Sequence, residues 1–163
     1  MNDTRHNSSH LAAALARLVP HRAPAAADPA DGRAVESRRL RAMRLSLRQD
    51  VIADATDPIP VGLYVLVKQG SDVAGRRAVA LAHAPRLGRA VADSYVDDAW
   101  QTDPAARPVL AQAHAALRRK KIRGLLCVSQ ADISPSASVY EPYLRQLHSA
   151  HGFLDLAHDE PHL

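Results

Sequence analysis

Cysteine is almost absent from this chain, because Cys127 is the only one in 163 residues. A single cysteine excludes an internal disulfide and fits a reducing compartment. The N-terminal sequence MNDTRHNSSH lacks the apolar core of a signal peptide, and no run of about 18 apolar residues occurs anywhere. We therefore expect a cytoplasmic protein with no membrane partner.

Aromatic residues and lysines are also scarce. Aromatics make up 4% of the chain, so the core must be built mainly from Leu, Val, Ile and Ala. Only three of the 21 basic residues are lysines: Lys68, Lys120 and Lys121. The net charge of +4 and the pI near 9.6 are compatible with DNA as a partner. Heavy use of arginine and alanine is equally typical of a GC-rich genome.

No motif for a cofactor or a metal ion is evident. The chain has no Gly-rich loop of the kind that cradles phosphates. The pairs His148/His151 and His158/His162 have spacings that suit a helix face, but no cysteine or carboxylate completes a recognised ligand set. Pro161 also prevents a helix around the second pair. We expect neither a cofactor nor a metal.

Residues 1–58 are interpreted as an N-terminal arm. A short apolar helix at 11–19 precedes a Pro/Ala linker at 20–32, whose three prolines disfavour a continuous helix. A basic amphipathic helix follows and ends before Pro58, with Leu40, Met43 and Leu47 at helical spacing. This helix either binds phosphates or a partner through its arginines, or packs on the domain through its Leu/Met stripe. The arginines concerned are Arg38, Arg41, Arg44 and Arg48.

From residue 59 to 160, predicted strands and helices alternate. Strands are expected at 61–67, 90–96, 124–128 and 152–157. Helices are expected at about 72–83, after Arg107-Pro108, and after Ser136 or Ser138. The alternation predicts a three-layer α/β domain with a small, mostly parallel sheet of about four strands. Ligands of such sheets bind at the carboxyl ends of the strands, here 68–71, 97–104 and 129–136.

The order of these landmarks resembles the catalytic domain of serine recombinases, the resolvase/invertase family. That domain has a Tyr-x-Arg-x-Ser motif on its first strand, a Tyr-x-Asp after the second, an Arg-Pro step and a Leu-Asp-Arg-x-x-Arg segment. The resemblance spans about a hundred residues and implies a resolvase-like fold. Four residues match the family's motifs: Tyr64, Asp97 (with Asp98 as the alternative), Arg107 and Asp132.

The departures from the family pattern fall on the chemistry. A serine nucleophile attacks the DNA phosphodiester in that family, and arginines stabilise the charge that develops. Here Lys68 stands at the nucleophile position. Three arginine positions hold Leu66, Ile133 and Ser136. The resemblance therefore predicts a catalytically degenerate domain without strand cleavage.

Nearby serines and one aromatic residue leave alternatives open. Ser71 lies three residues beyond the expected nucleophile, as a relocated nucleophile or as an ordinary loop residue. Ser134 and Ser136 flank Pro135 and are interpreted as turn and cap residues. Trp100 is either a lid over the sheet end or an exposed contact residue.

Three functions remain open on the sequence alone. The leading hypothesis is a DNA-associated or regulatory binding module with cationic surfaces on the arm and at the end of the helix that starts at Pro108. The alternatives are a scaffold for a protein partner or self-association, and an active recombinase with a relocated serine. The cations at the helix end are Arg118, Arg119, Lys120 and Lys121.

Overall fold

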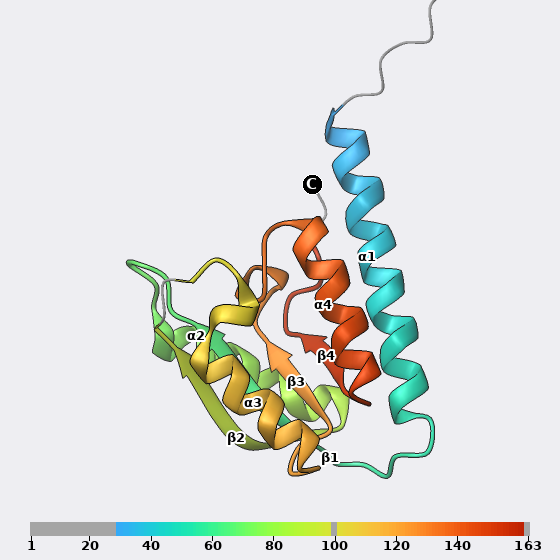
Figure 1. The fold of residues 1–163 in the computed structure, drawn as a ribbon, viewed down its shortest axis with the longest axis vertical. Helices are drawn as coiled ribbons and strands as arrows, with labels where there is room; N and C mark the ends of the chain where they lie inside the picture. Colours follow the sequence, from blue (N-terminus) through green and yellow to red (C-terminus); the bar gives the residue numbers. More distant parts are fainter. Residues whose placement is uncertain (1–28, 99–100, 162–163) are drawn as a thin grey trace, which may run out of the picture.

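Four parallel strands form one central sheet, in the order β2-β1-β3-β4 (Figure 1). The computed structural model describes residues 29–98 and 101–161. The strands are β1 (Ile59–Leu66), β2 (Arg89–Asp97), β3 (Gly124–Cys127) and β4 (Phe153–Leu156). The short helix at 11–19, most of the predicted linker, Trp100 and His162 lie outside the described residues.

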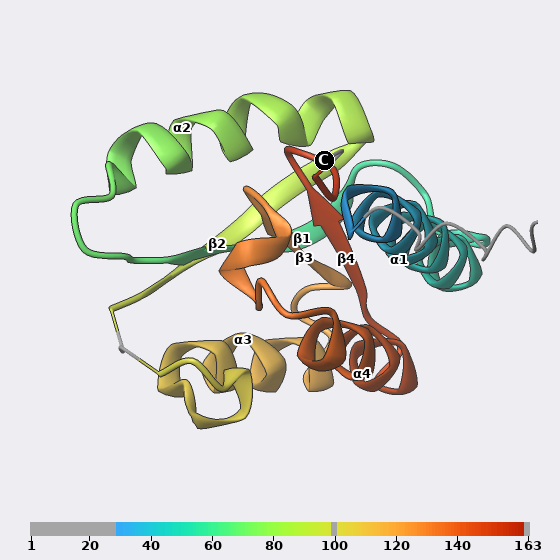
Figure 2. The ribbon, with the colours of Figure 1, turned by 90° about the horizontal axis from the view of Figure 1, so that it is seen from above.

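Helices cover both faces of the sheet and one of its edges. α2 (Val73–His83) lies on one face, and α3 (Pro108–Arg118) and α4 (Ala137–Ser149) lie on the other (Figure 2). α1 (Pro29–Ile52) packs against α4 and β4. Short 3-10 turns occur at Ala84–Leu87, Pro104–Ala106 and Gln130–Asp132. The prediction of a three-layer α/β domain with a mostly parallel sheet is confirmed.

β1 is buried on both faces, as its continuous apolar sequence indicates. Alternate residues of β1 point to opposite layers. Tyr64 belongs to the core cluster formed with α3 and α4, while Leu63 and Val65 belong to the cluster under α2. Cys127 is completely buried in β3, and burial raises the pKa of its thiol well above the usual value. It is therefore a small apolar core residue, as its position in an apolar run predicts.

The helix of the N-terminal arm begins earlier than the sequence suggested. The predicted linker extended to residue 32, but α1 starts at Pro29, because proline is well tolerated in the first turn of a helix. Leu40 is buried, and Met43 and Leu47 pack against the same core cluster. The helix is thus attached to the domain through its Leu/Met stripe. Within the described residues, no helix is long and apolar enough to cross a membrane.

Candidate functional site

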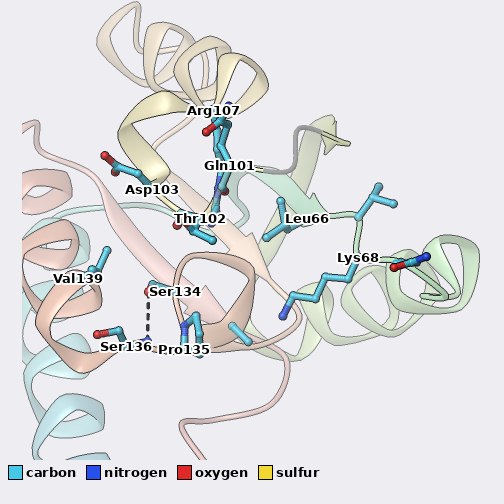
Figure 3. A pocket seen from close by; sticks show the side chains of 13 residues that line it. Leu66, Lys68, Gln101, Thr102, Asp103, Arg107, Ser134, Pro135, Ser136 and Val139 are labelled. Atoms are coloured by element: carbon cyan, nitrogen blue, oxygen red, sulfur yellow. Dashed lines mark hydrogen bonds between the residues drawn. The ribbon is translucent and has the colours of Figure 1, made fainter.

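A pocket of about 730 Å³ opens at the carboxyl edge of the sheet (Figure 3). It lies between the end of β1 and the loops that follow β2 and β3, where sequence analysis placed the ligand edge. Lys68 enters from β1, Gln101 to Asp103 from the second loop, and Ser134 to Ser136 from the third. Leu66, Pro135 and Val139 add apolar walls.

Arg107 lines this pocket, but its guanidinium is occupied. Its Nε donates to the carbonyl of Gln101 at 2.8 Å, its Nη1 to the carbonyl of Asp132 at 2.7 Å, and its Nη2 to the carbonyl of Thr102 at 3.1 Å. The side chain is 2% exposed. These bonds use three of the five N–H donors of the guanidinium and hold two loops together, and burial leaves little of the group open to a ligand oxygen.

Asp132 lies beneath the pocket and is completely buried. Its Oδ2 accepts hydrogen bonds from the backbone N–H of Val128 at 3.1 Å and of Ser129 at 3.0 Å. Its Oδ1 pairs with the guanidinium of Arg76 on α2 and also accepts from Leu66 N–H at 3.4 Å. Sequence reasoning missed Arg76, because nothing in α2 marks one of its arginines as the partner of a carboxylate 56 residues away.

Tyr64 and Asp97 form a second buried pair. The Tyr64 hydroxyl donates to Asp97 Oδ2 at 3.3 Å, and the same oxygen accepts from Leu110 N–H at 3.2 Å in the first turn of α3. Burial raises the pKa of Tyr64, so its hydroxyl remains protonated. Asp97 is completely buried whereas Asp98 is exposed, which supports Asp97 as the counterpart of the family aspartate.

Lys68 and Ser71 take different positions although they share a loop. The exposed Lys68 side chain extends across the mouth of the pocket towards Pro135 (Figure 3). Ser71 does not line the pocket, and its Oγ accepts from Lys68 N–H at 3.1 Å. Of the residues singled out from the sequence, Lys68 and Arg107 therefore meet in the pocket, Asp132 supports it from below, and Ser71 stays outside.

Three of the four α1 arginines that the sequence offered as phosphate ligands form ion pairs within the protein. Arg44 is 2% exposed and pairs with Glu160 at 2.7 Å and with Asp159 at 2.8 Å. Arg41 pairs with the same Asp159 at 2.7 Å. Arg48 pairs with the buried Asp155 at 3.1 Å, and Arg38 is exposed. These arginines thus pair with carboxylates of β4 and of the segment after it, which leaves less of α1 available to a polyanion.

The last residue of α3, Arg118, and the turn that follows it lie at the opposite edge of the sheet, next to the start of β3. This turn contains Arg119, Lys120 and Lys121. All four side chains are exposed. None of them forms a salt bridge with another residue in the described part of the chain. We call residues 118–121 the basic turn.

The described ranges contain no candidate cluster of metal ligands. No group of three or more His, Cys, Asp or Glu side chains is placed to hold an ion there. The His158/His162 pair is undecided, because His162 lies outside these ranges.

Two solved structures share the architecture described above. One is the N-terminal catalytic domain of TP901-1 integrase, with a TM-score of 0.53, 16% identity, and coverage of 60% of this chain and 76% of that one. The other is the C-terminal catalytic domain of ISC1926 TnpA, an IS607-like serine recombinase, with a TM-score of 0.54, 13% identity, and coverage of 64% and 74%. The chain has the fold of a serine recombinase catalytic domain.

This likeness confirms the resemblance drawn from the motifs at the level of the fold. No protein-family model matches the chain, and no curated protein sequence matches it. What the recombinase-like domain does must therefore be argued from its own residues.

Proposed function

We propose that this recombinase-like domain does not cleave DNA and instead serves as a DNA-associated binding module. One observation carries the first part. Lys68 stands where the recombinase pattern has its serine nucleophile. Arg107 is the only arginine among the described residues that line the pocket, and it donates to three backbone carbonyls.

Strand cleavage by a serine needs a hydroxyl in line with a phosphate and fixed cations around the developing charge. Ser134 and Ser136 are the serines among the described residues that line the pocket. Ser134 Oγ accepts from Ser136 N–H at 3.1 Å, and Ser136 Oγ lies 2.8 Å from Ser138 Oγ. No histidine or carboxylate is hydrogen-bonded to either hydroxyl in the described part of the chain, so neither serine has one of these bases in place to accept its proton.

The basic turn supports the second part of the proposal. Four adjacent exposed cations suit the closely spaced phosphates of a duplex, and they lie at the edge of the sheet opposite the pocket. Each neutralised phosphate contributes about 0.9 to the slope of log K against log salt. A contact through this turn therefore predicts a slope near −3.6 at full engagement, by the same rule for about four phosphates.

Cleavage is tested on supercoiled plasmid with the full chain. After denaturation in detergent, we expect neither nicked DNA nor a covalent protein–DNA adduct. An adduct that disappears in Ser71→Ala would refute the non-cleaving assignment and identify Ser71 as a relocated nucleophile.

Binding is tested by fluorescence anisotropy on a labelled duplex over a range of salt concentrations. The triple variant Arg118→Gln/Arg119→Gln/Lys121→Gln should lose about 2.7 from the slope. Lys120 is left unchanged because its φ of 57° makes substitution there ambiguous.

The matched control removes the same charge elsewhere, with Arg33→Gln/Arg77→Gln/Arg86→Gln. All three of these arginines are exposed. Equal losses in both triple variants would contradict a contact through the basic turn. Undetectable or salt-insensitive binding of the unmodified chain, together with self-association in light scattering, would favour the protein scaffold instead.

A further inference from the structure

The pocket lies at the point where the order of the strands reverses. Chain connections run from β1 outwards to β2, and then back past β1 to β3 and β4. The loops after β1 and β3 therefore diverge, and a crevice between them is the usual ligand site of an open parallel sheet. The volume of about 730 Å³ falls within the range of small-molecule sites.

One cation of the pocket is available to a ligand. Lys68 is exposed, spans the mouth (Figure 3), and forms no salt bridge within the described ranges. Arg107 is committed to carbonyls, as shown above. The acidic group of the lining, Asp103, lies on the other side, where its Oδ1 accepts from Ala105 N–H at 2.9 Å. Lys68 thus offers one positive charge to the pocket.

The same pocket also contains a buried hydrogen-bond donor. Ser134 is 4% exposed and lines the pocket. Its oxygen accepts from Ser136 N–H, and its own hydrogen has no acceptor among the described residues. A hydroxyl in this state gains a hydrogen bond when a ligand supplies an acceptor.

The remaining walls are largely apolar. Leu66, Pro135 and Val139 line the cavity from three different segments of the chain. Leu66 stands where the recombinase pattern has an arginine, so the same departure that removes a cation for DNA cleavage also supplies an apolar surface. A flat or apolar body fits such walls, whereas the evenly charged backbone of DNA would lose its hydration there with Lys68 as the one available cation among the described lining residues.

We propose that this pocket binds a small organic anion: an apolar body carrying one phosphate or carboxylate group, which Lys68 holds by charge while Ser134 donates a hydrogen bond. The proposal rests on the non-cleaving part of the proposed function, because it gives the pocket a new occupant. It is independent of DNA binding through the basic turn at the other edge.

The test uses the full chain and the dye 8-anilinonaphthalene-1-sulfonate, an anion with an apolar body that fluoresces when it is bound in an apolar site. Three competitors share one ring system: 1-naphthyl phosphate, 1-naphthoate and the uncharged 1-naphthalenemethanol. We expect one or both anions to displace the dye at concentrations at least about fivefold lower than the alcohol. The ratio of the two anions identifies which headgroup is preferred.

Variants locate the site. Lys68→Met should weaken anion binding by about fivefold or more and leave the alcohol unaffected, whereas the control Lys121→Met should change neither. Val139→Glu, at an exposed position of the wall, should abolish anion binding through charge repulsion. Circular dichroism confirms that each variant is folded.

Equal affinities for the anions and the alcohol, or anion binding that is unchanged in Lys68→Met and Val139→Glu, would overturn the proposal. Anisotropy with the labelled duplex separates it from the DNA proposal. Lys68→Met should keep the salt slope of DNA binding, and the basic-turn triple variant should keep anion displacement. A loss of DNA binding in Lys68→Met would show that the duplex occupies the pocket, and this too would refute a separate anion site.

Discussion

The buried ion pair between α1 and the end of the chain allows a quantitative prediction. Arg44 Nε lies 2.7 Å from Glu160 Oε1, and Arg44 Nη2 lies 3.0 Å from Glu160 Oε2. The Tyr140 hydroxyl donates to the same Glu160 carboxylate at 2.8 Å. Burial, and then the charge of Glu160, raises the pKa of Tyr140, which keeps the hydroxyl protonated as a donor. The change to test is Arg44→Met.

The expected magnitude follows from burial. Arg44→Met leaves Glu160, which is 1% exposed, as a buried carboxylate with only Tyr140 as a donor among the described residues. Removing one partner of such a pair costs about 3–5 kcal/mol. Glu160→Gln should cost less, about 1–2 kcal/mol, because it removes the buried negative charge and Arg44 keeps Asp159 at 2.8 Å. The double variant should then be more stable than Arg44→Met alone.

The assay is urea unfolding followed by circular dichroism at pH 7. With a slope of about 2 kcal/mol per molar urea, the midpoint should fall by about 1.5–2.5 M in Arg44→Met. The control is Arg39→Met on the same helix, whose partners Glu36 and Glu141 lie at the surface, and we expect its midpoint to stay within error of the unmodified chain. The reasoning is refuted if the two variants are equally stable, or if the double variant is the least stable of the set.

Three further predictions concern the sheet and its surroundings. Gly62→Ala should destabilise the fold by about 1–3 kcal/mol, because the new Cβ would lie 2.7 Å from Tyr95 Cε2 and 2.9 Å from Ile122 Cδ1. The control is Gly32→Ala in α1, where a Cβ would meet nothing within 4 Å. In thermal unfolding this control should be more stable than the unmodified chain by about 0.5–1 kcal/mol. Asp132→Asn should lower the free energy of unfolding in urea by about 2–3 kcal/mol, since the amide weakens the pair with Arg76 and accepts fewer hydrogen bonds than the carboxylate. An equal loss of stability in Asp103→Asn, at the exposed turn, would contradict this. Burial, and then the charge of Arg118, lowers the pKa of His114 from 6.5, so the unfolded chain binds a proton first, and stability should fall as pH drops below about 6.5. Urea midpoints at pH 7.5 and pH 5.5 should show a smaller difference in His114→Gln, and an unchanged difference would exclude His114 as the cause.

The layers of the fold could be predicted because their signals are local. The apolar run of β1 and the Arg107-Pro108 step that opens α3 each lie within a few residues of the element they define. The ends of the helices and strands are harder to predict than their presence. α1 starts at Pro29 because a proline that disfavours the middle of a helix is tolerated in its first turn, and composition alone does not distinguish these two uses.

The electrostatic partners could not be predicted from the sequence. Arg44 and Glu160 are 116 residues apart, and Arg76 and Asp132 are 56 apart. No periodicity links such positions, since the fold alone brings them together. A row of arginines on a helix therefore looks the same in sequence whether it faces phosphates or carboxylates, and only the position of the C-terminal segment decides for Arg44.

The four residues that match the recombinase motifs share a structural property. Each is buried, and each satisfies backbone groups or a buried side chain across at least two segments: Tyr64, Asp97, Arg107 and Asp132. Replacing any of them would leave a buried donor or acceptor unpaired, which costs about 1–3 kcal/mol for each group. Stability alone is therefore a sufficient reason for these residues to be present, whatever happens in the pocket above them.

The positions that depart from the motifs carry no such cost. Lys68 and Ser136 are exposed at the pocket, where a change of side chain leaves no buried group unpaired. Leu66 and Ile133 are buried apolar residues where the pattern has arginine, which avoids the cost of desolvating a charge. The matches are thus buried polar groups that need partners, whereas the departures are either exposed or apolar. For this reason the matching motif residues support the fold and say little about catalysis, and the chemistry of the pocket has to be inferred from the residues that changed.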